Sequence, residues 1–172
     1  MKYLLGIPGF AFLYVRDKLI SNFKPLHTGW FGQKDPFIAR LSGLKYDPTA
    51  RRFESGLQSV IGAYTSVPGL KMIQKIGTEN IEKHVSELVE IFLAGIARLK
   101  PVIVTPSDER YRGPLVALKA KDATKLLKKL ESENVVASKW KDNIRISFHF
   151  YNNRQDVKAV IKALEKNRQL LY

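Results

Sequence analysis

The residues nearest the amino end combine one lysine amine with a segment that could fix its position. Lys2 is followed by residues that favour a tight turn, namely Gly6, Pro8 and Gly9. Residues 10–15 are apolar, which is typical of a buried strand. This order would present a single amine to a cofactor pocket, with the strand as its anchor. Only one residue precedes the lysine, so we expect the rest of such a pocket to come from elsewhere.

A second candidate lies on a predicted strand near the carboxyl end. Apolar and polar side chains alternate over residues 144–151, a pattern that places them on opposite faces of a sheet. The apolar set is Ile144, Ile146, Phe148 and Phe150, and the polar set is Arg145, Ser147, His149 and Tyr151. Arg145 therefore points away from the core, where its guanidinium could bind a carboxylate through two hydrogen bonds. The alternative is an arginine that is only solvated on an open sheet face.

Two loop segments carry further groups that could contact a ligand. Trp30 lies between two glycines, where an indole can serve a ligand or a partner, and the alternative is a hydrophobic plug that holds a long loop in place. Ser55 and Gly56 precede a helix that we expect to begin at Leu57. A hydroxyl and free backbone N–H groups at a helix amino end suit a phosphate, and the alternative is an ordinary capping serine.

The first third of the chain offers few regular elements to position these groups. We expect a short helical turn at residues 16–22 and an irregular loop over residues 24–55, where prolines and glycines are frequent. A loop of this length inside a compact chain is usually functional or an interaction segment. Helical spacing returns at residues 57–75, with a kink or break at Pro68.

From residue 77 onward the pattern predicts helices and strands in close succession. The expected elements are a helix over residues 78–99 capped by Thr78, strands at 102–104 and 114–118, a helix after the capping residue Asp122, the strand at 144–151 and a helix over residues 157–164. This order predicts an α/β fold with a short, mostly antiparallel sheet and helices on one face.

Composition narrows the functions that the chain can have. It has 172 residues, enough for one domain or one domain with an arm. It has no cysteine, which excludes disulfides, thiolate metal sites and a cysteine nucleophile. Its three histidines are far apart in sequence, so we assign no metal site. The apolar run near the amino end is too short to cross a membrane and follows glycine and proline, so we expect a cytoplasmic protein.

The chain carries a net charge of +13, because 29 lysines and arginines outnumber 16 acidic residues. Such a charge could attract nucleic acid, anionic lipid or phosphorylated small molecules. The basic residues are spread along the faces of the predicted helices and form no compact tail or repeat. We therefore favour a solvated basic face over a nucleic-acid surface.

Four segments, in this order, resemble segments of the class-V aminotransferases, which are pyridoxal-phosphate enzymes of fold type I. The segments are residues 2–9 (KYLLGIPG), 28–32 (TGWFG), 51–56 (RRFESG) and 144–152 (IRISFHFYN). The resemblance covers nearly the whole chain and is closest to kynureninase-like, isopenicillin N epimerase-like and cysteine desulfurase-like enzymes. It implies that the chain is the carboxyl-terminal part of such an enzyme. Residues 1–56 would then be a large-domain strand with a long interface loop, and residues 57–172 the small domain with its connecting helix.

The resemblance also implies roles for the candidate residues. Lys2 corresponds to the lysine that forms the Schiff base with pyridoxal phosphate. Arg145 corresponds to the arginine that binds the α-carboxylate of an amino-acid substrate. Trp30, Ser55 and Gly56 lie in segments that contact the cofactor phosphate of a neighbouring subunit, which implies a homodimer.

Two positions depart from the family pattern. The family has a threonine after the glycine of the Arg-Phe-Glu segment, where this chain has Leu57, so one hydroxyl for the phosphate is lost. Desulfurases need a cysteine on the loop before the arginine strand, where this chain has residues 139–143 (KWKDN). Sulfur transfer by that mechanism is therefore excluded.

In this family the amino-terminal half supplies most of the cofactor pocket. We therefore expect the chain alone to be inactive and not to retain the cofactor, and to need an amino-terminal half, which a separate gene could encode. A second hypothesis is a non-catalytic remnant that associates with itself through residues 24–55 and the helix after them. A third is a basic nucleic-acid-binding protein, which rests on the net charge alone.

Overall fold

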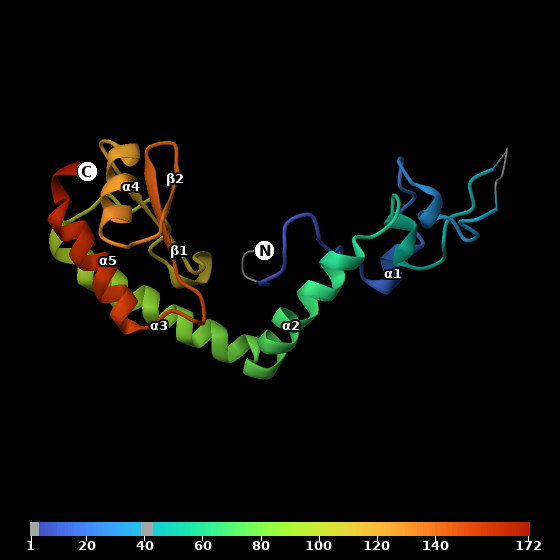
Figure 1. Ribbon diagram of the computed structural model, residues 1–172, viewed down its shortest axis with the longest axis horizontal. Helices are drawn as coiled ribbons and strands as arrows, with labels where there is room; N and C mark the ends of the chain where they lie inside the picture. The colour runs from blue at the N-terminus through green and yellow to red at the C-terminus, as the bar shows by residue number, and fades with distance from the viewer. Residues whose placement is uncertain (1–3, 39–42) are drawn as a thin grey trace. The chain divides into compact units, whose positions relative to one another are not determined.

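The chain divides into two units, residues 1–75 and residues 76–172. The computed structural model describes residues 4–38 and 43–172, so Lys2 lies outside the described residues (Figure 1). The division between residues 1–56 and 57–172 that the resemblance implies stays a prediction.

Alternating buried residues organise the second unit around a three-stranded antiparallel sheet. Its strands are β1 (Leu115–Lys119), β2 (Ser138–Trp140) and β3 (Asn143–Ser147), and β3 lies between the other two. Figure 1 labels β1 and β2. One face is buried, and its residues are Val116, Leu118, Ile144 and Ile146. The period-two pattern of β3 thus gives one buried face and one open face, as predicted.

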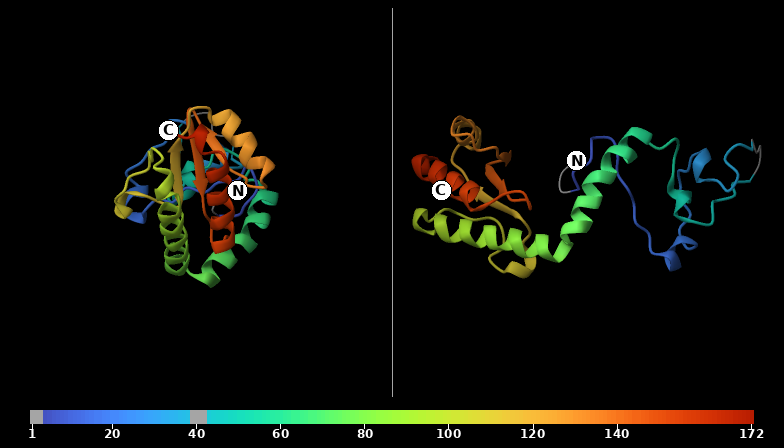
Figure 2. Two further views of the ribbon diagram at one scale, coloured as in Figure 1. Left: turned by 90° about the vertical axis from the view of Figure 1, so that its left-hand side faces the viewer. Right: turned by 60° about the horizontal axis from the view of Figure 1, so that its bottom comes forward.

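Three helices cover the buried face of this sheet. They are α3 (Thr78–Ile96), α4 (Ala123–Ser132) and α5 (Arg154–Lys166), and α3 and α5 lie side by side (Figure 2). Phe92 of α3 is fully buried and meets the ring of Phe148 edge-on, with ring centroids 5.6 Å apart. The predicted short antiparallel sheet with helices on one face is confirmed. Short 3-10 helices at Ala97–Leu99, Glu109–Tyr111 and Arg168–Leu170 complete this unit.

The helices α4 and α3 begin in different ways. The Asp122 carboxylate accepts the backbone N–H of Lys125 at 2.8 Å, so the predicted cap of α4 is confirmed. Thr78 is not a cap, because it is the first residue of α3 and its side chain makes no capping bond. Gly77 precedes it with a φ of 86°, in the left-handed region that glycine adopts without strain.

Two strand predictions in this unit are wrong, and one strand was not predicted. The strand after Asn143 ends at Ser147 and not at residue 151, because the His149 N–H donates to the Asn152 side-chain oxygen at 2.9 Å and the chain turns there. Residues 102–104 form only one isolated bridge, between Ile103 and Leu118. Strand β2 was not predicted from the sequence, because all three of its residues are exposed and show no alternation.

The first unit contains less regular structure. Its elements are α1 (Asp17–Ile20), 3-10 helices at Trp30–Gly32 and Ala50–Phe53, and α2 (Val60–Ile76). The short first helix agrees with the prediction, and so does the irregular character of residues 24–38 and 43–55. Residues 10–15, however, form no strand, and Phe12, Leu13 and Tyr14 are exposed. A strand needs a hydrogen-bonding neighbour, and nothing in the part of the chain that the structure describes supplies one to this segment.

The amino end of α2 also differs from the prediction. The helix begins at Val60, and the Ser59 hydroxyl accepts the N–H of Gly62 at 3.1 Å. Ser59 therefore caps this helix, and Ser55 and Gly56 lie before it, outside any helix or strand. Pro68 lies inside the helix. Among residues 4–38 and 43–172, the helices are too short or too polar for any of them to cross a membrane.

Candidate functional site

The loop that carries Trp30 lies against the segment that carries Ser55. A methyl group added to Gly29 would overlap the backbone carbonyl of Ser55, so only glycine permits this approach. One turn further on, a Cβ on Gly32 would lie 2.8 Å from the carbonyl oxygens of Arg52 and Glu54. The structure therefore brings two of the predicted cofactor-binding segments together through backbone contact.

The buried side chain of Arg52 stabilises this loop through hydrogen bonds to backbone carbonyl groups. Only 8% of Arg52 is exposed, and its Nε donates to the Asp47 carbonyl at 2.9 Å. Its Nη1 donates to the carbonyl oxygens of Ile20 at 2.7 Å and Phe23 at 3.0 Å. The Arg52 side chain thus joins the turn at Asp47 to the backbone of residues 20–23, which are distant in sequence. Sequence analysis placed this arginine in a motif and missed its structural role.

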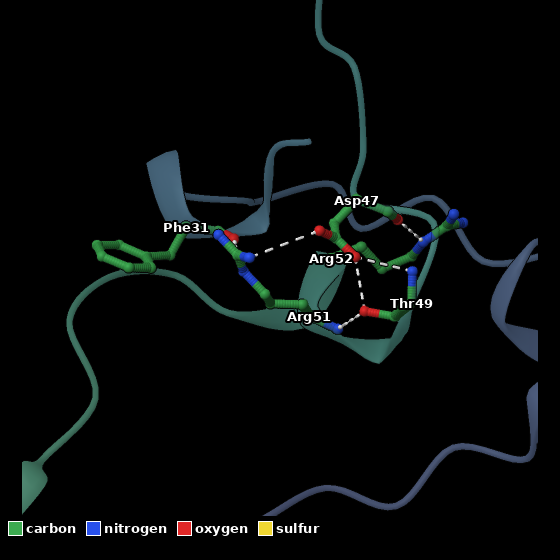
Figure 3. A network of polar contacts seen from close by, with 5 residues as sticks. All are labelled: Phe31, Asp47, Thr49, Arg51 and Arg52. Atoms are coloured by element: carbon green, nitrogen blue, oxygen red, sulfur yellow. Dashed lines mark hydrogen bonds and ion pairs between the residues drawn. The ribbon is translucent and has the colours of Figure 1, made fainter. Parts of the chain in front are cut away.

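The Asp47 carboxylate organises the turn before Arg52 (Figure 3). One of its oxygens accepts the Thr49 N–H at 2.8 Å and the Thr49 hydroxyl at 2.6 Å. The Arg51 guanidinium lies 3.9 Å from the other oxygen and donates through Nε to the Phe31 carbonyl at 3.3 Å. The hydrogen bond from the Thr49 hydroxyl, above all, holds the pKa of Asp47 below its usual value.

This lowered pKa predicts a pH dependence in the first unit. A carboxyl whose pKa is lower in the folded state stabilises the fold at pH values above its unfolded pKa. That contribution is lost as the pH falls through the folded pKa of Asp47. Replacing Thr49 by valine removes the hydroxyl donor, so an NMR titration of the Asp47 carboxyl carbon should show a higher pKa than in the parent chain. An unchanged pKa in Thr49→Val would contradict the assigned cause.

Trp30 belongs to a small aromatic cluster in the same loop. Its ring meets those of Phe31 and Phe37 edge-on, with centroids 5.0 and 5.8 Å away. The indole is nevertheless 45% exposed, so it is held in place without being buried as a plug. This arrangement leaves part of the indole available to a ligand or a partner.

Ser55 and Gly56 present polar groups to solvent. The Ser55 side chain is exposed, and a Cβ on Gly56 would meet no atom within 4 Å. In the described part of the chain no acceptor receives the backbone N–H of either residue. A hydroxyl and two unused N–H groups could bind a phosphate group, although Leu57 supplies no hydroxyl where the family that the chain resembles has threonine.

Arg145 lies in the second unit, on the open face of the sheet. Strand pairing places it opposite Ala117 on β1 and opposite Ser138 on β2. With Ala117, Trp140 and Asn143 it lines an open pocket of about 420 Å³. Within residues 4–38 and 43–172, no hydrogen bond or ion pair occupies its guanidinium. Arg145 is therefore free to bind an anion in this pocket.

The predicted site residues thus fall into separate groups. Trp30, Ser55 and Gly56 lie in the first unit, and Arg145 lies in the second. Lys2 is outside the described residues. The described residues contain no group of three side chains that could hold a metal ion.

Comparisons with known proteins agree with one another on the family. A family model described as "Aminotransferase class-V" matches residues 2–160. An uncharacterised aminotransferase of Bacillus subtilis is 31% identical over 163 residues, which are 95% of this chain and 42% of the relative. A probable cysteine desulfurase of Halalkalibacterium halodurans is 26% identical over 185 residues, with 96% of this chain and 43% of the relative covered. The chain therefore spans less than half the length of these relatives.

Solved structures show the same fold. The cysteine desulfurase CsdA of Escherichia coli matches with a TM-score of 0.78 and 18% identity, over 98% of this chain and 45% of that one. The apo cysteine desulfurase of Thermococcus onnurineus matches with a TM-score of 0.77 and 21% identity, over 91% of this chain and 42% of that one. The residues that these matches cover therefore include most of both units.

Proposed function

The chain belongs to the class-V aminotransferase family, and from this premise we propose that it is the carboxyl-terminal part of a pyridoxal-phosphate enzyme that acts on an amino acid. The observation that carries the proposal is the backbone contact between Gly29 and Ser55. This contact joins the two segments whose family counterparts reach the cofactor phosphate. The unoccupied guanidinium of Arg145 adds a binding group for the substrate carboxylate.

Each residue would then have a defined task. Trp30, Ser55 and Gly56 would bind the phosphate of the cofactor in a neighbouring subunit, so the active form would be a homodimer. Arg145 would orient the substrate through its carboxylate, and Lys2 would attach the cofactor and accept the substrate Cα proton at Nζ. When bound, the cofactor supplies an electron sink for the bonds at that carbon.

Exposed apolar side chains in the first unit support the need for an amino-terminal half. They are Phe12, Leu13, Tyr14, Leu57, Val60, Ile61 and Tyr64. Apolar surface of this extent is costly in water and is typically covered by another part of the protein or by a partner. The same surface favours the second candidate function, a remnant that associates with itself.

A reconstitution experiment separates these two functions. The chain would be produced together with the part of the Bacillus subtilis relative that it does not match, which under this proposal is the amino-terminal region. We expect this complex to retain pyridoxal phosphate through gel filtration, with its absorbance band, and the chain alone to lose it. A chain that forms a closed dimer alone and neither recruits that region nor retains cofactor would contradict the proposal.

Arg145 provides a kinetic prediction for the reconstituted enzyme. Removing a charged hydrogen-bonding group that holds a carboxylate costs about 3 kcal/mol, so Arg145→Gln should raise KM for the amino acid by about 100-fold. The absorbance of the bound cofactor should not change. Lys119→Gln is a matched control, because Lys119 lies on the same sheet face with its ammonium over the ring of Tyr172, at 5.2 Å. An equal effect of both substitutions would contradict the role of Arg145.

A further inference from the structure

The pocket around Arg145 contains an indole that the proposed function does not use. Trp140 is the last residue of β2 and pairs with Asn143 of β3. Because directly paired residues share a face of the sheet, Trp140 lies on the same face as Asn143 and Arg145. Both Trp140 and Arg145 line the pocket of about 420 Å³.

The backbone that carries this indole belongs to a hairpin. Strands β2 and β3 are joined by a tight two-residue turn, in which Lys141 has a φ of 52°. The carbonyl of Asp142 in this turn accepts the N–H of Ala120 at 2.8 Å, which ties the hairpin to the end of β1. Trp140 therefore lies on an edge strand that is paired with β3, and not on a free loop.

A small residue opens the space beside the guanidinium. Ala117 is the direct cross-strand partner of Arg145, and its methyl group leaves the pocket hollow where a larger side chain would fill it. Trp140 is 64% exposed, and in the described residues its ring contacts no other aromatic ring. The indole therefore offers an exposed apolar surface in the same pocket as the guanidinium.

We propose that Trp140 is a specificity-determining residue, and that this pocket selects carboxylates that carry an aromatic or other large apolar group. The assignment rests on the proposed function for the identity of the substrate as an amino acid. Arg145 binds the carboxylate with two hydrogen bonds, while the indole packs against the apolar side chain. Arg145 on β3 thus recognises the charge of the ligand, and Trp140 on β2 recognises its apolar group.

The pairing of these two groups defines the ligand chemically. A small carboxylate such as propionate would use Arg145 only, whereas 3-phenylpropionate would use Arg145 and Trp140. The neutral 3-phenylpropanamide has the ring without the charge and would lose the guanidinium contact. These three compounds therefore report on the two halves of the pocket separately.

The first test uses the full chain without cofactor, so it does not depend on the proposed function. NMR would follow the indole N–H of Trp140 and the Nε–H of Arg145 during titration with each compound, with Trp30→Phe assigning the indole signals. We expect 3-phenylpropionate to shift both signals and to bind at least about 10-fold more tightly than propionate or the amide, as a loss of about 1.4 kcal/mol would give. Equal binding of all three, or no binding of any carboxylate, would overturn the proposal.

Variants test the division of roles. Trp140→Ala should remove the preference for 3-phenylpropionate and leave propionate binding unchanged, and Ala117→Leu should weaken both by filling the pocket. Tyr111→Ala is the control, because it removes another exposed ring from the same unit. The proposal would be overturned if Trp140→Ala kept the preference for 3-phenylpropionate. It would also be overturned if the indole N–H signal of Trp140 changed with protein concentration and not with ligand concentration.

A second readout in the reconstituted enzyme separates this inference from the proposed function. Trp140→Ala should lower the ratio of kcat/KM for L-phenylalanine to that for L-alanine by about 10-fold, while the cofactor band stays unchanged. An unchanged ratio would overturn the role of Trp140 alone. Loss of the cofactor from the parent complex would instead count against the proposed function.

Discussion

Replacing Arg52 by alanine should destabilise the first unit by about 3–5 kcal/mol. The substitution leaves the carbonyl oxygens of Ile20, Phe23 and Asp47 without the donor that they share. Buried acceptors that lose a charged donor are costly, because water cannot replace it without opening the structure. Hydrogen exchange at the Asp47 amide, which donates to the Gly32 carbonyl at 3.0 Å, measures this loss.

The neighbouring arginine supplies a matched control. Arg51 is exposed, and its ion pair with Asp47 spans 3.9 Å, so Arg51→Ala should cost less than about 1 kcal/mol. Arg52→Lys should recover only a small part of the loss, because one ammonium cannot reach three carbonyl groups in this geometry. Equal effects of Arg51→Ala and Arg52→Ala would show that Arg52 does not hold the loop.

Replacing Gly29 by alanine should separate the Trp30 loop from the Ser55 segment. The added methyl group would overlap the Ser55 backbone carbonyl, which cannot move aside as a flexible side chain can. We expect a loss of about 2–3 kcal/mol in the stability of the first unit, as for other cases of overpacking. In the reconstituted enzyme the same variant should weaken cofactor retention, because the two segments no longer meet.

Gly56→Ala is the control for that substitution. Gly56 lies next to Ser55, its φ is outside the left-handed region, and a Cβ there would meet no atom within 4 Å. The stability of the Gly56→Ala variant should therefore stay close to that of the parent chain. If Gly29→Ala were as stable as Gly56→Ala, the contact that carries the proposed function would be contradicted.

The sequence predicted the second unit best, because its core depends on local periodicity. Alternation around Arg145 placed Ile144 and Ile146 on the buried face, and helical spacing predicted α3 with Phe92 in the core. Asp122 was recognised as a cap, because its interaction with Lys125 spans only three residues. Local signals of this kind need no knowledge of distant contacts.

The first unit was predicted less well, because distant contacts decide its structure. Apolar residues 10–15 have the composition of a strand, yet a strand forms only where a neighbour offers hydrogen bonds. Two adjacent arginines look alike in sequence, and only the carbonyl groups that converge on Arg52 distinguish it from Arg51. Strand β2, with Trp140, gave no alternation, because it is exposed along its whole length.

The most direct test of the central claim is to locate the cofactor covalently. The chain, combined with the amino-terminal region of a class-V relative, would be treated with pyridoxal phosphate and borohydride, digested, and analysed by mass spectrometry. The account predicts one dominant phosphopyridoxyl label, on Lys2, that appears only when the amino-terminal region is present. A label spread over the surface lysines, or one that is the same with the chain alone, would contradict the account.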